Sequence, residues 1–140
     1  MNKTEATRFL ALVKLAYPSA YRDMDDISKK ATINMWASSF PDVPYQIMEQ
    51  GFNHFRFVSK FPPTVAEMAD ELKSIHFQAT ECALIQKTLG NEDGVKQYKS
   101  IMDYTSRYKD DSYLGGLNIN ALQGLLSSGE GYAGLPEADT

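Results

Sequence analysis

Two adjacent prolines followed by a helix-start signal most limit how this chain can fold. Pro62 and Pro63 cannot continue a helix, because proline lacks the backbone N–H and its ring clashes with the preceding turn. Directly after them, Thr64 and Glu67 have the three-residue spacing of a capping box, in which each side chain accepts a backbone N–H at the start of a helix. The pattern predicts that one helix ends before residue 62 and that another begins at residue 65.

Helical spacing of apolar residues extends over most of the chain, and no segment of useful length alternates in the manner of a strand. The main expected helices span 4–17, 25–40, 44–59, 65–89 and 95–108. A weak sixth helix is expected at 119–126. Asn2 and Glu5 form a cap-like pair before the first helix, and Gly90 is placed to end the fourth. The predicted fold class is therefore all-α.

The fourth segment is unusually long, since residues 65–89 extend over about 37 Å at 1.5 Å per residue. A bundle of three to four small helices cannot cover that length, so the second half of this helix is expected to project. Six of the nine glycines lie in the last 26 residues, where they raise the entropy cost of ordering the backbone. We therefore expect a compact helical domain at 1–75, an extended helical region for partner binding at 76–110, and a mobile Gly/Ser-rich tail at 111–140.

Charge and aromatic residues divide the chain in a similar way. Residues 1–63 carry eight Lys/Arg against six Asp/Glu, whereas residues 64–140 carry six against twelve. All seven phenylalanines and Trp36 precede residue 78, and five of the eight tyrosines follow residue 97. Phenylalanine is typical of cores and tyrosine of half-wet interfaces. These patterns predict a phenylalanine-filled front and an acidic rear that suits a basic protein surface better than nucleic acid.

Catalytic and metal-binding patterns are not found in the sequence. The single cysteine, Cys82, excludes an intrachain disulfide and fits a reducing compartment. His76 lies six residues before it, about 240° away around a helix, so the two side chains cannot hold one metal ion. His54 is expected to be structural or solvated. No phosphate-binding loop or nucleophile elbow occurs. We expect no enzymatic activity, no metal and no cofactor.

Three carboxylates at the start of the fourth helix suit the positive end of its dipole better than acid–base chemistry. They are Glu67, Asp70 and Glu71. No apolar run approaches the roughly 20 residues that cross a bilayer. The expected location is the cytosol, with no membrane partner.

The rear of the chain carries the residues expected to bind a protein partner, through an amphipathic stretch that gains order in an apolar groove. They are Val95, Tyr98, Met102, Tyr108, Tyr113, Leu117, Ile119, Leu122, Leu125 and Leu126. The alternative is that Tyr98, Met102 and Tyr108 fold back on the fourth helix. Both arrangements are compatible with the sequence.

Several motifs of the front occur in a recognisable order. Leu15-Ala16-Tyr17-Pro18 closes the first helix, Trp36 lies in the second, Pro44-Tyr45 opens the third, and Phe61-Pro62-Pro63-Thr64-Val65-Ala66-Glu67 leads into the fourth. In this order, residues 4–75 resemble the N-terminal domain of the replicative-helicase loader and inhibitor proteins of tailed phages. The resemblance implies a small helical, non-enzymatic adaptor of DNA replication. Its partners would be a ring-shaped replicative helicase of host or phage and an origin-binding initiator.

Two other functions remain open at this point. A nucleic-acid-binding replication or regulatory protein would use Lys29, Lys30, Arg56 and Lys60 as its contact surface. A phage inhibitor of another host enzyme would share the small size, the acidity and the missing catalytic residues. Direct binding of nucleic acid is the less favoured of these, because the rear of the chain is acidic.

Overall fold

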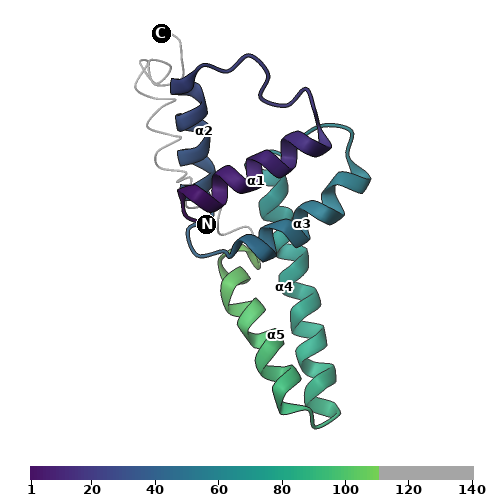
Figure 1. Cartoon of the computed structure of the whole chain (residues 1–140). Coiled ribbons are helices and arrows are strands. Elements are labelled where there is room, and N and C mark those ends of the chain that lie inside the picture. Colours follow the sequence, from purple (N-terminus) through teal and green to yellow (C-terminus); the bar gives the residue numbers. More distant parts are fainter. Residues whose placement is uncertain (111–140) are drawn as a thin grey trace, which may run out of the picture. The chain divides into compact units, whose positions relative to one another are not determined.

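The computed structural model describes residues 1–110, and every regular element within them is a helix. The elements are α1 (Lys3–Ala16), α2 (Asp26–Ser39), α3 (Tyr45–Val58), α4 (Val65–Thr88), α5 (Glu92–Thr105) and the short 3₁₀ helix η1 (Ser106–Tyr108), all shown in Figure 1. Residues Met1–Lys109 form one compact unit. The all-α class is confirmed for this part of the chain, and the expected sixth helix at 119–126 lies outside the described residues.

Both predicted capping boxes are present. The Thr64 side chain accepts the backbone N–H of Glu67 at 3.1 Å, and the Glu67 carboxylate accepts the N–H of Thr64 at 3.0 Å. Asn2 and Glu5 exchange the same pair of bonds at the start of α1. A cap of this kind stabilises a helix by about 1 kcal/mol. The helix boundaries therefore follow from local chemistry.

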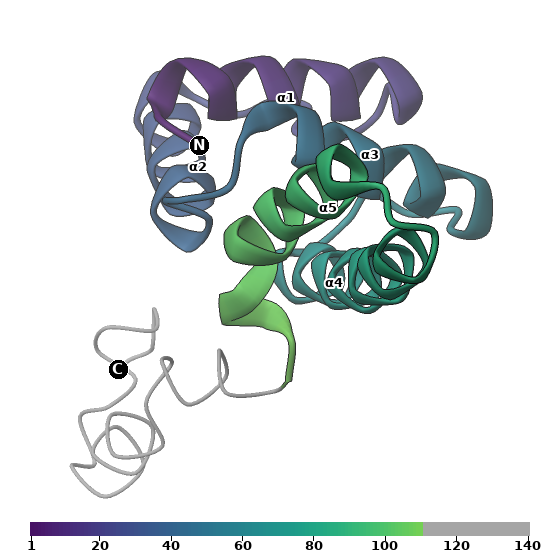
Figure 2. The same cartoon turned by 90° about the horizontal axis from the view of Figure 1, so that it is seen from below.

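An aromatic cluster joins the first three helices. The ring of Phe9 on α1 lies 5.3 Å from Trp36 of α2 and 5.7 Å from Phe52 of α3, measured between ring centroids. Trp36 stacks on Phe40 at 5.9 Å. All four side chains are almost completely buried. Figures 1 and 2 show α3 between α1 and α4, packed against both.

Composition predicted a front filled by its phenylalanines, but three of the seven are exposed or half exposed in the structure. Phe57 at the end of α3 and Phe61 in the following loop are 78% and 76% exposed, and Phe77 on α4 is half exposed. The buried stripe of α3 includes Phe52 and Phe55, and residue 57 falls beside it. Composition counts residues but does not say which face of a helix they occupy.

The second half of α4 extends beyond α1–α3, as its length predicted, but it does not stand alone. α5 runs back along it in the opposite direction, so that the two form a helical hairpin (Figure 1). Residue 75, where the compact domain was expected to end, lies inside α4, which continues through it without a break.

A tight turn reverses the chain between α4 and α5. Gly90 has a φ of +73°, in the left-handed region that favours glycine. Its N–H bonds to the carbonyl oxygen of Lys87, and the N–H of Asn91 bonds to that of Gln86, which together make a Schellman motif. Gly90 therefore ends the helix as the sequence predicted, and it directs the chain back along α4.

Candidate functional site

The start of α5 is held closely against the end of α4. The Asn91 side-chain oxygen caps α5 by accepting the N–H of Gly94, while its amide group donates to Gln86 Oε1 at 2.8 Å. A Cβ atom at position 94 would lie 2.7 Å from the same Gln86 oxygen. Glycine therefore permits a close approach at this end of the hairpin.

A buried polar contact holds the far end of the same hairpin. His76 Nδ1 on α4 lies 3.0 Å from the hydroxyl oxygen of Thr105 on α5, and both side chains are buried. The Thr105 hydroxyl also lies 2.8 Å from the carbonyl oxygen of Ile101, which accepts its proton. The hydroxyl must then accept from His76, so the imidazole carries a proton on Nδ1. His76 is thus a structural link between the two helices.

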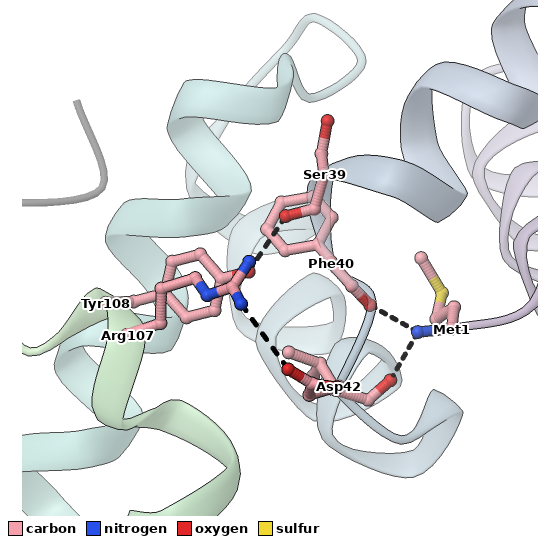
Figure 3. Close-up of polar contacts among 7 residues, drawn as sticks. Met1, Ser39, Phe40, Asp42, Arg107 and Tyr108 are labelled. Atoms are coloured by element: carbon pink, nitrogen blue, oxygen red, sulfur yellow. Dashed lines mark hydrogen bonds and ion pairs between the residues drawn. The ribbon is translucent and has the colours of Figure 1, made fainter. Parts of the chain in front are cut away.

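Tyr108 fastens the end of the hairpin to the front of the molecule. Its hydroxyl donates to the carbonyl oxygen of Ser39 at 2.8 Å, and its ring lies 5.5 Å from that of Phe40 (Figure 3). Burial raises the pKa of the Tyr108 hydroxyl above its ordinary value. The contact extends the aromatic cluster of α1–α3 to η1.

The loop between α2 and α3 receives two further contacts. The Met1 amino group donates to the carbonyl oxygens of Phe40 and Val43. Arg107 lies 3.5 Å from Asp42 in an exposed ion pair. Figure 3 shows these groups converging on one short segment from two sides. No sequence pattern indicated this junction, because its partners lie about 40 to 70 residues apart.

Four of the residues that the sequence predicted to bind a partner lie in the described part of the chain. All four are at least partly buried. Val95, Tyr98 and Met102 are half-buried on α5, and Tyr108 is buried. Tyr98, Met102 and Tyr108 therefore fold back toward α4 and α2 in this structure. The remaining predicted residues lie outside the described part of the chain: Tyr113, Leu117, Ile119, Leu122, Leu125 and Leu126.

The second half of α4 exposes apolar residues that the sequence patterns did not single out. Phe77 and Leu84 are more than half exposed and lie seven residues apart, two turns along one side of the helix. Ile85 and Leu89 are also more than half exposed nearer the turn. Their exposure depends on which side of α4 is covered by α5, and the spacing within α4 does not carry that information. Exposed apolar groups that gather on one element are typical of protein-binding surfaces.

A second exposed group lies where α3 ends. The guanidinium of Arg56 stacks over the ring of Phe57, 4.6 Å from its centroid, and Val58 and Phe61 are also exposed. The Tyr17 hydroxyl donates to the carbonyl oxygen of Ser59 at 2.8 Å and fixes the chain at this point. The arrangement combines a cation with apolar surface.

The carboxylates at the start of α4 have structural partners. Glu67 completes the capping box, and Glu71 lies 2.8 Å from Nδ1 of His54 on α3. His54 is exposed, as expected for a structural or solvated histidine. Within residues 1–110 no group of three or more His, Cys, Asp or Glu side chains is arranged to hold a metal ion. No helix in this range has the length and apolar character to span a membrane.

Comparison with known proteins finds a family model that matches the front of the chain. Residues 1–69 match the model for the N-terminal domain of the phage helicase loader/inhibitor family. No curated protein and no solved structure matches the chain. The matched part covers α1, α2, α3 and the first turn of α4, and it ends before the rest of α4 and before α5.

Proposed function

We propose, from the premise that residues 1–69 belong to the N-terminal domain family of the phage helicase loaders and inhibitors, that the chain is a non-enzymatic adaptor that binds a replicative ring helicase. The match of residues 1–69 is the observation that carries this proposal. The binding would restrain the helicase or deliver it to an origin, in the cytosol of the host. An origin-binding initiator is the second partner that this role calls for.

The exposed residues of the α4–α5 hairpin support the proposal that the rear of the chain binds the helicase. All of it except the first turn of α4 lies beyond the matched residues, and it exposes Phe77, Leu84 and Leu89, the last of them beside the turn. Acidic residues accompany them there, at Glu92 and Asp93 in the first turn of α5. Exposed apolar side chains with flanking charge form the kind of surface that a helix presents to a groove.

The predicted partner residues then have two roles in the proposal. Val95, Tyr98 and Met102 pack toward α4 in the free chain and become available when a helicase displaces α5 from it. Tyr113, Leu117, Ile119, Leu122, Leu125 and Leu126 continue the contact along the chain. The mechanism is steric and electrostatic, since it requires no bond to be made or broken.

The binding experiment compares the full chain with residues 1–110 in a pull-down with purified replicative helicase. The cut at residue 110 keeps α5 and η1, which pack on α4 and on the α2–α3 loop. We expect residues 1–110 to bind at least tenfold more weakly than the full chain. Leu84→Ser with Leu89→Ser in the full chain should also weaken binding, whereas Leu15→Ser, which changes a similarly exposed leucine of α1, should not.

Failure of the full chain to bind any replicative helicase would contradict the proposed function. Equal binding by the full chain and by residues 1–110 would move the site into the described part. In that case the hairpin variants decide between α4 and the front.

The exposed cation and aromatic rings at the end of α3 favour a second candidate function, which is binding of single-stranded nucleic acid. Arg56, Phe57 and Phe61 supply a charge and two exposed rings, as in proteins on which bases stack. Lys60 adds a second cation. Fluorescence anisotropy with a labelled dT15 oligonucleotide tests it, because true binding would fall steeply as salt is raised.

A further inference from the structure

An open cavity of about 180 Å³ lies between α1, α2 and the loop that joins them. On the α1 side it is lined by positions spaced as i, i+3, i+4 and i+7, from Thr7 through Leu10 and Ala11 to Lys14. These residues form one stripe along the helix. The cavity is therefore an open groove that two turns of α1 line on one side.

The other wall of this groove comes from α2 and the loop. Lys29, Thr32 and Ile33 line it from the first two turns of α2, again at helical spacing. Tyr21 and Met24 line it from the loop between the two helices. The lining is thus mainly apolar, with one lysine from each helix.

The loop holds one lining residue, Tyr21, and the nearby Asp23 in an unusual backbone conformation. Tyr21 has a φ of +59° and Asp23 a φ of +63°, both in the left-handed region. A bulky side chain such as tyrosine rarely occupies that region, and strained residues cluster where a structure binds something. Burial raises the pKa of the Tyr21 hydroxyl, in keeping with a ring that packs into the wall.

Charge indicates what the groove accepts. Lys14 and Lys29 are the charged residues that line it, and no carboxylate within residues 1–110 does so. Asp25, just before α2, accepts the backbone N–H of Ser28 as the cap of that helix. An occupant that complements this lining places an apolar side chain in the cavity and carboxylates beside the two lysines.

We infer that the groove between α1 and α2 docks an acidic amphipathic helix of a protein partner, with one apolar side chain in the cavity and carboxylates on Lys14 and Lys29. The two lining stripes match the way a helix lies in a groove between two others. The site belongs to the front of the molecule and is separate from the hairpin surface of the proposed function. It stands whether or not the chain binds a helicase.

The test measures binding of a synthetic probe to the full chain by fluorescence anisotropy. The probe is a fluorescein-labelled, amidated 16-residue helical peptide with leucine at i, i+3, i+4 and i+7 and glutamate at the flanking positions. A copy with lysine for each glutamate is the matched peptide control. We expect the acidic peptide to bind at least tenfold more tightly than the basic copy, and to shift the NMR amide signals of α1 and α2 around the groove.

The protein variants locate the site. Lys14→Glu with Lys29→Glu should weaken binding of the acidic peptide at least tenfold, and Ala11→Phe, which fills the cavity, should do the same. Lys3→Glu with Lys30→Glu makes the same change of charge at exposed lysines that do not line the cavity, and should alter binding less than twofold. Circular dichroism of each variant establishes that α1 and α2 are intact.

Three results would overturn the inference. Equal binding of the acidic and basic peptides would mean that the peptides bind through apolar contacts alone, without a contribution from the lysines. Equal loss in the two double-lysine variants would mean attraction to the whole surface. Tighter binding of a labelled dT15 oligonucleotide than of the acidic peptide, lost in the Lys14/Lys29 variant, would assign the lysines to nucleic acid.

Discussion

The front of the molecule and the α4–α5 hairpin are built from the same kind of helix but are held together differently. Large aromatic rings, among them Phe9, Trp36 and Phe52, fill the space between α1, α2 and α3. Several buried residues of the hairpin are small or polar, such as Ala79, Ala83 and Thr105. Apolar burial stabilises a fold roughly in proportion to the area that is buried. Small and polar side chains bury less apolar area, so burial stabilises the hairpin less than it stabilises the front. We therefore expect one compact unit to contain a firm part, α1–α3, and a part that opens at lower cost, the hairpin.

The largest expected effect is a loss of stability in the firm part, α1–α3. Phe52→Ala removes a fully buried ring that contacts Phe9 and Tyr17, and should lower the free energy of unfolding by about 3–5 kcal/mol through lost burial and the cavity left behind. Urea titration followed by tryptophan fluorescence measures it. Phe57→Ala, on the same helix but 78% exposed, is the control and should change stability by less than about 0.5 kcal/mol. Similar losses in both variants would show that α3 is not held by its buried face.

A smaller loss of stability is expected in the hairpin alone, which would separate its stability from that of α1–α3. Thr105→Val removes the acceptor for buried His76 and should cost about 1–3 kcal/mol, because it leaves a desolvated N–H without its bond. Hydrogen exchange should show faster exchange in α5 and the second half of α4, with α1–α3 unchanged. Thr80→Val is the matched control, since that hydroxyl bonds to the His76 carbonyl one turn earlier on its own helix. Uniform acceleration across the molecule would mean that the hairpin does not open separately.

The junction between the two parts supplies a pH-dependent prediction. Tyr108→Phe removes the bond to the Ser39 carbonyl and should cost about 0.5–1.5 kcal/mol at neutral pH. The pKa of Tyr108 is raised by burial in the folded state, so the neutral hydroxyl stabilises the fold fully below the unfolded value of about 10. That contribution disappears as pH rises through the folded pKa.

The measurement compares the stability of the native chain and Tyr108→Phe between pH 8 and pH 11. The difference should be constant up to about pH 10 and should shrink above it. Tyr17, Tyr21 and Tyr45 also have raised pKa values and remain in both proteins, so their effect cancels. A difference that grows above pH 10 would contradict a buried neutral hydroxyl.

The smallest effect concerns the exposed ion pair of the same junction. Arg107→Gln should change stability by less than about 1 kcal/mol, because both members of the Arg107–Asp42 pair are exposed and screened by water. Thermal melts at low and high salt measure the change, with Lys109→Gln as the control. A loss larger than that of Tyr108→Phe would make charge, and not the buried ring, the main attachment of the hairpin.

Local signals predicted the first four helices well because each boundary is set by neighbours in sequence. The fifth helix was expected at 95–108 but spans Glu92–Thr105, because Asn91 caps it and Gly94 lies in its first turn. The prolines at 62 and 63, the two capping boxes and Gly90 all act within a few residues, and each appears in the structure where it was expected. Contacts between distant residues were not predictable in this way. The bond between Tyr108 and Ser39 joins residues 69 apart, and no spacing rule in a single sequence connects them.

The candidate surfaces show the same limit. Val95, Tyr98 and Met102 were selected because they make an amphipathic stripe, but a stripe does not say whether α4 or another protein covers it. Phe77 and Leu84 are exposed because α5 leaves their side of α4 uncovered. The groove between α1 and α2 depends on how the two helices cross, which follows from packing and not from the pattern of either one.

The attachment of η1 determines how the hairpin would respond to a mechanical load. A pull applied to the chain beyond residue 110 reaches the Tyr108–Ser39 bond before any turn of α5. Once that bond breaks, α5 can separate from α4 one turn at a time toward Gly90. A load on this end would therefore open the hairpin progressively and leave the aromatic front intact.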